Sequence, residues 1–165
     1  FPDFRAYERS FQLIQQVSGR AGRSSERGKV CVQTYNPKHK ILKNIINDDY
    51  ISMFEGEISD RVKYNYPPNC KLIKITLKHK DYSIINESSD CLGKYLRQFF
   101  KKNILGPEFT HVIRVRNKFQ KNILIKIQKN QSLNQTKSII IKSKKSLSSI
   151  AKFRSVQIII NVDSY

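Results

Sequence analysis

The sequence predicts a mixed fold, in which an α/β segment is followed by an α+β domain with the element order β-α-β-β-α-β. Three observations support this prediction. Basic residues are concentrated in the second part, since residues 1–70 hold 11 basic and 8 acidic residues whereas residues 71–165 hold 20 and 5. The consecutive prolines Pro67 and Pro68 lie at this change and disfavour a continuous helix. Apolar residues repeat with a period of two in short stretches and with helical spacing between them.

The first expected domain, residues 1–66, is predicted to be mainly helical with one strand. A helix is expected at residues 7–17, because apolar side chains fall on one stripe at helical spacing, and these are Phe11, Ile14 and Val17. Residues 29–35 (KVCVQTY) alternate and are rich in β-prone side chains, so they are expected to form a strand. From residue 39 to residue 64 the pattern is helical again, with a break near residues 47–49.

The second expected domain, residues 67–165, contains four stretches with strand periodicity and two with helical periodicity. The strands are expected at residues 71–80, 111–116, 123–129 and 156–162, and the helices at residues 82–102 and 133–150. In each strand the apolar side chains would face one way and the polar ones the other. Gly106 and Pro107 are expected to break the chain before the second strand, and residues 117–122 to form the turn that follows it.

This element order is that of the split βαβ, or ferredoxin-like, plan. Both helices should cover one face of a four-stranded antiparallel sheet. The other face should then present the basic side chains that alternate with the apolar ones, and these are Lys74, Lys78, Arg114, Arg116 and Lys126. We expect these five to be the DNA-binding residues, with the two arginines strongest because a guanidinium can hold a phosphate with two N–H groups. The alternative is that the charges only solvate an exposed sheet and protect its edges from pairing.

The net charge of +18 indicates a polyanionic partner. Nucleic acid is the first candidate and an anionic membrane surface the second, but no apolar run approaches the roughly 18–20 residues that a membrane span needs. About five phosphate contacts on duplex DNA would give a slope of log K against log salt of about −4 to −5. The cysteines Cys31, Cys70 and Cys91 are far apart in sequence, so no metal site is predicted. An odd cysteine count without a signal sequence favours reduced thiols in the cytoplasm.

Residues 16–23 (QVSGRAGR) resemble motif VI of superfamily 2 helicases, Q-x-x-G-R-x-G-R, and match it at every fixed position. ATP hydrolysis builds negative charge on the transferred phosphoryl group, and a guanidinium beside that group stabilises the charge. The resemblance implies that Arg20 and Arg23 are catalytic contacts to the γ-phosphate, with Arg23 as the arginine finger. It also implies that Gln16 and Gly19 belong to the same ATP-binding site. The alternative is a solvated loop rich in Arg and Gly.

Longer segments around this motif are similar to one family. They are PDFRAYERSFQLIQQVSGRAGR, GKVCVQTYNPKH, DDYISMFEGEISDRVKYNYPP, ILGP and, near the end, IIINVD. On these residues the chain resembles the primosomal protein N′ family, replication-restart DNA helicases of superfamily 2. The family usually has a proline after the final V-D, where this sequence has Ser164. The resemblance implies that residues 1–66 are a remnant of the second RecA-like helicase lobe and that residues 67–165 are a basic C-terminal DNA-binding domain.

The resemblance also implies an activity and partners. Members of the family are ATP-dependent helicases that move 3′ to 5′, recognise stalled or branched replication forks and initiate primosome assembly. The partners would be branched and single-stranded DNA, single-strand-binding protein and other primosome proteins, and no membrane.

Several parts of such a helicase are absent from this sequence, so we expect the chain to be a fragment. The phosphate-binding loop, the Mg²⁺-binding motif and the zinc-binding cysteines lie upstream in relatives. ATP and Mg²⁺ would therefore be held mainly outside this chain, which contains no zinc ligands and would be inactive alone. Residues 1–40 are expected to pack poorly without the upstream part of the lobe, because a parallel sheet needs several strands to bury a core.

The residues also allow two other functions. The basic domain could be a protein-interaction module that docks the acidic tail of single-strand-binding protein, because an acidic peptide and a phosphate chain both attract Lys and Arg. It could also be a ribosome-like RNA-binding domain of the same fold, although such a domain has no use for QVSGRAGR. Competition between fork DNA and the acidic peptide would separate the first two functions, and equal affinity for structured RNA would favour the third.

Overall fold

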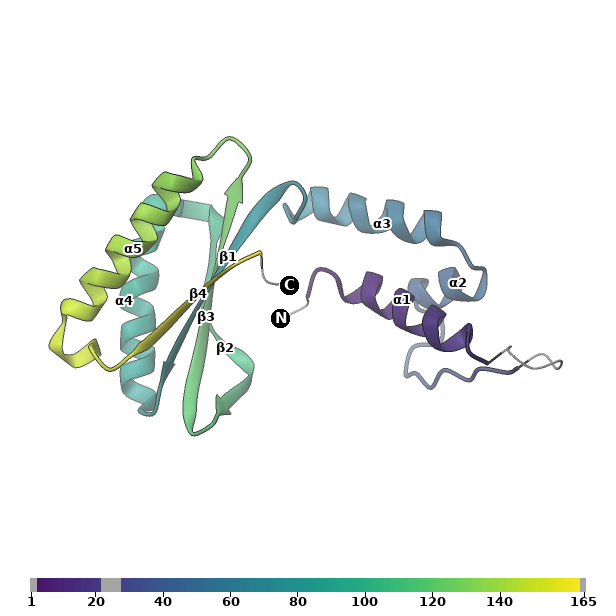
Figure 1. Ribbon diagram of the computed structural model, residues 1–165, viewed down its shortest axis with the longest axis horizontal. Helices are drawn as coiled ribbons and strands as arrows, with labels where there is room; N and C mark the ends of the chain where they lie inside the picture. Colours follow the sequence, from purple (N-terminus) through teal and green to yellow (C-terminus); the bar gives the residue numbers. More distant parts are fainter. Residues whose placement is uncertain (1–2, 22–27, 164–165) are drawn as a thin grey trace. The chain divides into compact units, whose positions relative to one another are not determined.

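The computed structural model describes residues 3–21 and 28–163 (Figure 1). Within these ranges the chain is mixed α and β, with five α-helices and one four-stranded sheet. It divides into two compact units, one that ends at Tyr64 and one that begins at Asn65. Arg23, the expected arginine finger, lies outside the described residues.

The first unit consists of three helices, α1 (Ala6–Ser18), α2 (Lys40–Ile46) and α3 (Tyr50–Lys63). Its small core contains Phe11 from α1 and Met53 from α3, which are both buried. Asp48, between α2 and α3, has a φ of 52° and so turns the chain. The helix expected at residues 7–17 and the later helical region with its break are thus confirmed.

The strand expected at residues 29–35 is wrong. Residues 28–34 form neither helix nor strand, and Val30, Val32 and Tyr35 are exposed. A strand is stable only when its backbone N–H and C=O groups pair with a neighbour, and the described part of the first unit contains no strand. These β-prone residues therefore have no sheet to join. That residues 1–40 pack poorly without the upstream part of the lobe stays a prediction. Amide hydrogen exchange of this chain would test it.

The second unit is a four-stranded antiparallel sheet covered by two helices. Its elements are β1 (Cys70–His79), α4 (Tyr82–Phe100), β2 (Ile104–Val115), β3 (Lys118–Gln128), α5 (Leu133–Ser149) and β4 (Gln157–Val162). Short 3-10 helices at Lys101–Asn103 and Ala151–Phe153 follow α4 and α5. The strands lie in the order β2-β3-β1-β4, and every neighbouring pair is antiparallel. The predicted element order β-α-β-β-α-β is confirmed.

The core of the second unit lies between the sheet and the two helices. Alternate residues of the central strands are almost completely buried, and these are Ile73, Ile75, Leu77, Ile123, Ile125 and Ile127. They pack with a stripe of each helix, made of Ile85, Leu92, Leu96 and Phe100 from α4 and of Ile140 and Leu147 from α5. Figure 1 shows both helices on the same side of the sheet, as expected. In β4, Ile158 and Ile160 pack against this core, whereas Val162, also expected inward, is exposed.

Strand β2 is longer than expected and irregular. It begins at Ile104 and runs through Gly106 and Pro107, where a break was expected. Its pairing with β3 shifts register twice, once at these two residues and once between Phe109 and Arg114. The strand continues through the first irregularity because Gly106 takes a φ of 87°, in the left-handed region that glycine adopts without strain.

The turn between β2 and β3 is shorter than the expected residues 117–122. It contains Arg116 and Asn117, whose φ angles are 48° and 62°. Two positive φ angles in a two-residue loop are typical of the hairpin turns that match the twist of the strands. Residues 118–122 therefore belong to β3 rather than to the turn.

Candidate nucleic-acid interface

The face of the sheet opposite α4 and α5, which we call the open sheet face, carries polar side chains together with the buried Leu72 and Leu124. Its polar members alternate with the core residues and are Lys74, Thr76, Lys78, Glu108, Lys118, Gln120, Asn122, Lys126, Gln157 and Asn161. At its centre Thr76 Oγ1 donates a hydrogen bond to Asn122 Oδ1 over 2.8 Å, and both residues are buried. The lysines therefore surround an ordered polar centre.

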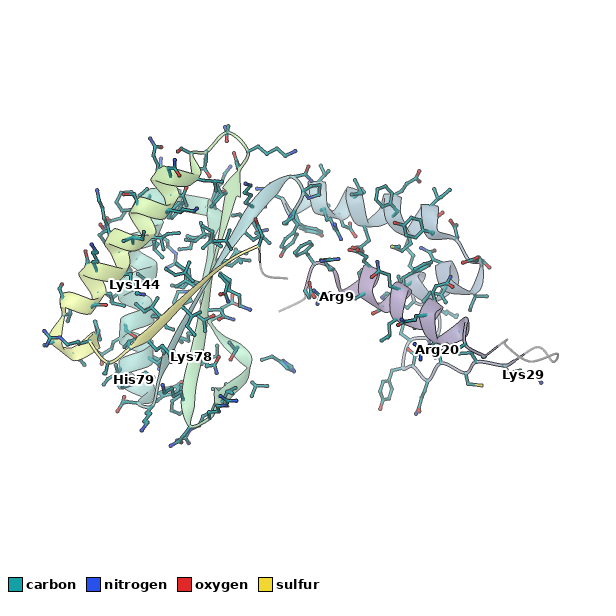
Figure 2. The ribbon with its side chains drawn as sticks, viewed as in Figure 1. Arg9, Arg20, Lys29, Lys78, His79 and Lys144 are labelled. Atoms are coloured by element: carbon teal, nitrogen blue, oxygen red, sulfur yellow. The ribbon has the colours of Figure 1, made fainter. Side chains whose placement is uncertain are left out.

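Three of these lysines have no ion-pair partner among the described residues. Lys74 and Lys78 lie on β1 on either side of Thr76, and both are half-buried; Figure 2 labels Lys78. Lys118 begins β3, and its Nζ donates a hydrogen bond to Gln157 Oε1 on β4 over 3.3 Å. Lys118 is an addition to the expected set, since it fell in the segment that was expected to be a turn.

Lys126 is more closely packed than Lys74 and Lys78. Its Nζ lies 3.8 Å from the centroid of the Tyr66 ring, which is a cation–π contact. Burial lowers the pKa of Lys126, and burial raises the pKa of the neighbouring Tyr66 phenol. Because its ammonium is partly desolvated and already held over a ring, we expect Lys126 to contribute less to phosphate binding than the two lysines of β1.

The expected placement of Arg114 and Arg116 on this face is wrong. Arg114 pairs across the hairpin with Phe119, which packs against the core on the helix-covered side. The Arg114 guanidinium carbon lies 5.1 Å from the Phe119 ring centroid, and the guanidinium donates a hydrogen bond to Asn117 Oδ1. Arg116 is exposed in the turn. The register shift between Phe109 and Arg114 reverses the alternation of β2, so Arg114 lies on the helix-covered side.

A cluster of aromatic rings lies at the same end of the sheet. The Tyr82 ring stacks on the Phe109 ring, with centroids 5.5 Å apart and an angle of 10° between the planes. Its centroid is also 5.4 Å from that of Phe119, in an edge-on arrangement. We call these three residues the aromatic cluster. The three rings meet because α4 begins beside the hairpin and β2 extends back to include Phe109.

The motif VI residues that the structure describes lie at the end of α1. Gln16 and Arg20 are exposed, and Gly19 has a helical φ of −65°. The backbone N–H of Arg20 donates to the carbonyl of Val17 over 3.1 Å. Figure 2 shows Arg20 where α1 ends. The Arg20 guanidinium takes part in no ion pair between described residues.

Helix α1 is held to α3 by a charged network. Arg61 on α3 contacts Glu8 on α1 over 2.8 Å and Glu57 over 3.7 Å, and Arg5 contacts Glu8 over 3.3 Å. The hydrogen bond from Arg5 is the largest cause that lowers the pKa of Glu8, whereas burial raises the pKa of Glu57. Nearer the end of α1, Gln15 Nε2 donates to Asp48 Oδ1 over 2.6 Å. These contacts fix the direction in which the end of α1 presents the motif.

Residues 3–21 and 28–163 contain neither a cluster of metal ligands nor a membrane-spanning helix. No group of three or more His, Cys, Asp or Glu side chains in these ranges is placed to hold a metal ion. No helix in them is both long enough and apolar enough to span a lipid bilayer.

Comparison with known proteins finds curated relatives that share one name. The chain is 31% identical over 135 residues to the replication restart protein PriA of Bacillus subtilis, 33% over 128 residues to that of Synechocystis sp., and 30% over 127 residues to that of Thermotoga maritima. These matches cover 81%, 76% and 77% of this chain but 17%, 15% and 17% of the relatives. The chain therefore spans about a sixth of their length. No family model matches the chain.

Proposed function

This chain belongs to the primosomal protein N′ (PriA) family of replication restart proteins, and we propose that it is the C-terminal portion of an ATP-dependent DNA helicase. That helicase would move 3′ to 5′ in the bacterial cytoplasm, recognise stalled or branched replication forks and initiate primosome assembly. The name that the relatives share supports the role in replication restart. The helicase activity belongs to the longer protein, of which this chain would supply one side of the ATP site and a domain that holds DNA.

The DNA-holding role belongs to the second unit. Its element order and its strand order, β2-β3-β1-β4, support a ferredoxin-like domain at residues 67–165. The observation that carries the proposal is that Lys74, Lys78 and Lys118 share the open sheet face of a unit in which residues 71–165 hold 20 basic and 5 acidic residues, a net charge of +15. Lysines on a flat face contact the phosphate chain of either strand and read no bases, so they favour DNA of any sequence.

The ATP-site role belongs to the first unit, which we propose is a remnant of the second RecA-like lobe at residues 1–66. The described residues fit a nucleotide only in part, because the exposed guanidinium of Arg20 at the end of α1 is the one motif cation among them. Arg20 would bind the γ-phosphate together with Arg23, and Gln16 would help to align the nucleotide. Bound ATP with Mg²⁺ would supply the phosphoryl group whose charge the arginines stabilise. Its other ligands, and any zinc site, would lie in the rest of the protein.

The proposal is tested by binding of labelled fork DNA to this chain, measured by fluorescence anisotropy. The test variant is Lys74→Gln/Lys78→Gln, and the matched control is Lys144→Gln/Lys145→Gln. The control removes the same two positive charges, but from exposed lysines of α5, of which Figure 2 labels Lys144. We expect the test variant to bind fork DNA about tenfold more weakly than the control, since each phosphate contact contributes to affinity. Equal loss in both variants would mean that only the net charge matters.

A second candidate function is a protein-interaction module that docks the acidic tail of single-strand-binding protein. The observation that favours it is the outer side of α5, where Lys137, Lys142, Lys144 and Lys145 are exposed beside the exposed Ile141. Cations around an apolar side chain suit a peptide that carries both carboxylates and an apolar residue. Displacement of labelled fork DNA by an acidic peptide would indicate a shared surface, and simultaneous binding would indicate two surfaces.

A further inference from the structure

The aromatic cluster of Tyr82, Phe109 and Phe119 lies on the helix-covered side of the sheet, away from the open sheet face. Figure 2 labels His79, the last residue of β1, which pairs with Phe119 on β3 and so marks this end of the sheet. Phe109 and Phe119 are partly buried and pack against the core. Tyr82 lies outside them and is 55% exposed although it contacts both rings. The cluster therefore combines two structural rings with a third that faces solvent.

Two cations lie over the structural rings. The Arg114 guanidinium carbon is 5.1 Å from the Phe119 centroid, and Lys121 Nζ is 4.8 Å from the Phe109 centroid. Cross-strand pairing explains both contacts, because Arg114 pairs with Phe119 and Lys121 pairs with Phe109. Arg114 is exposed, Lys121 is buried, and neither takes part in an ion pair between the residues that the structure describes.

An exposed ring in this setting has the properties of a platform for a nucleobase. A base stacks on an aromatic ring whatever its sequence, because every base has a π-face. The orientation of Tyr82 is already fixed by stacking on Phe109 and by the edge of Phe119, so little side-chain freedom is lost on binding. The exposed guanidinium of Arg114 can hold a phosphate with two N–H groups beside the platform. These groups together suit a nucleotide whose base is unpaired.

We infer that Tyr82 stacks with one unpaired nucleobase of single-stranded DNA while Arg114 contacts the adjacent phosphate. This rests on the proposed function, because it gives the DNA-holding domain a second contact on a different side of the sheet. The bases of a duplex are already stacked on one another, so duplex DNA cannot use the platform. The open sheet face would hold phosphates of any strand, and the aromatic cluster would select a single-stranded arm.

The experiment compares two ligands and four variants of this chain. The ligands are a short single-stranded oligonucleotide and a blunt duplex, each bound by fluorescence anisotropy at one salt concentration. The variants are Tyr82→Ala, Tyr82→Leu, Tyr82→Phe and Phe99→Ala. Phe99 is the matched control because it lies on the same helix and is 47% exposed. It also contacts another aromatic ring, since its ring centroid lies 5.4 Å from that of Tyr95. Tyr82→Leu keeps apolar contact with Phe109 but has no ring, so it remains informative if Tyr82→Ala lowers the melting temperature.

A second readout reports stacking directly. The oligonucleotide carries 2-aminopurine, whose fluorescence falls when the base stacks. The unmodified chain and Tyr82→Phe should quench this signal, whereas Tyr82→Ala and Tyr82→Leu should not. For single-stranded binding we expect both ring-less variants to lose about tenfold in affinity, with duplex binding and the Phe99→Ala control unchanged.

The outcomes separate this inference from the proposed function. If the unmodified chain binds neither ligand, the DNA-holding role itself is wrong and the inference fails with it. If it binds both ligands and Tyr82→Leu still binds and quenches the oligonucleotide normally, the proposed function stands and the stacking site is wrong. A selective loss of single-stranded binding, restored by Tyr82→Phe, is the result that the inference requires.

Discussion

Thr76 and Asn122 are direct partners across the two central strands, and their side chains share a hydrogen bond of 2.8 Å on the open sheet face. Both residues are buried, so each polar group depends on the other for its partner. A slip of one residue between β1 and β3 would turn Asn122 towards the apolar core. The pair therefore helps to fix the register that places Lys74 and Lys78 on the same face.

The Thr76→Val variant should be less stable by about 1–2 kcal/mol, because Asn122 Oδ1 would then be buried without a donor. Urea unfolding followed by circular dichroism measures the change. The double variant Thr76→Val/Asn122→Leu should recover most of the loss, since no unpaired polar group remains. Costs that simply add in the double variant would show that the two side chains do not interact.

Replacement of Gly106 by alanine should destabilise the second unit by about 2–4 kcal/mol. Gly106 has a φ of 87°, and a Cβ atom there would lie 2.5 Å from the backbone oxygen of Asn122. The control is Gly19→Ala, where φ is −65° and the nearest backbone oxygen would be 3.5 Å from the Cβ. That control should leave stability unchanged or raise it slightly. A thermal melt of Gly106→Ala that matches the unmodified chain would contradict the described path of β2.

The contact of Glu8 with Arg5 and Arg61 should make the first unit sensitive to acid. The pKa of Glu8 is lowered, chiefly by the hydrogen bond from Arg5. A carboxyl group with a lowered pKa stabilises the folded state above its unfolded pKa, and this contribution is lost as the pH falls through the folded value. Stability should therefore fall below about pH 4.5. Glu8→Gln should be less stable at neutral pH, and its stability should depend less on pH in this acid range. Glu55→Gln changes an exposed residue of α3, so its stability should follow that of the unmodified chain at every pH.

Alanine at both motif arginines should lower ATP turnover of the full-length protein by about a thousandfold or more, because an arginine finger contributes that much to phosphoryl transfer. The variant is Arg20→Ala/Arg23→Ala, and the measurement is steady-state hydrolysis with DNA present. Arg9→Ala is the control, because Arg9 lies on α1 but outside the motif and pairs with Asp3 over 2.5 Å. Normal ATP turnover in the double variant would show that the motif is not part of the ATP site.

The sequence predicted the elements of the second unit well, because its periodicity was strong. Ile73, Ile75 and Leu77 alternate on β1 and are buried as expected, and the stripe on α4 covers them. The lysines Lys74 and Lys78 alternate with these residues, so their face followed from the same pattern. Periodicity failed at residues 29–35, where a β-prone segment has no partner strand among the described residues.

The arginines and the aromatic cluster could not be predicted from local patterns. The face on which Arg114 lies depends on a register shift in β2, and no residue type in this segment predicts such a shift. Tyr82 and Phe109 come together only because α4 starts beside the irregular part of β2. Such contacts arise from the packing of whole elements, so they become visible only in the folded unit.

The salt dependence of fork binding tests the role of the open sheet face most directly. We predict that log K for this chain falls against log salt with a slope of about −4 to −5 on duplex arms. In Lys74→Gln/Lys78→Gln the slope should become shallower by about 1.8, because each lost phosphate contact removes about 0.9. In Lys144→Gln/Lys145→Gln it should stay the same. A slope that is unchanged in the first variant and reduced in the second would show that the DNA lies on the helix-covered side.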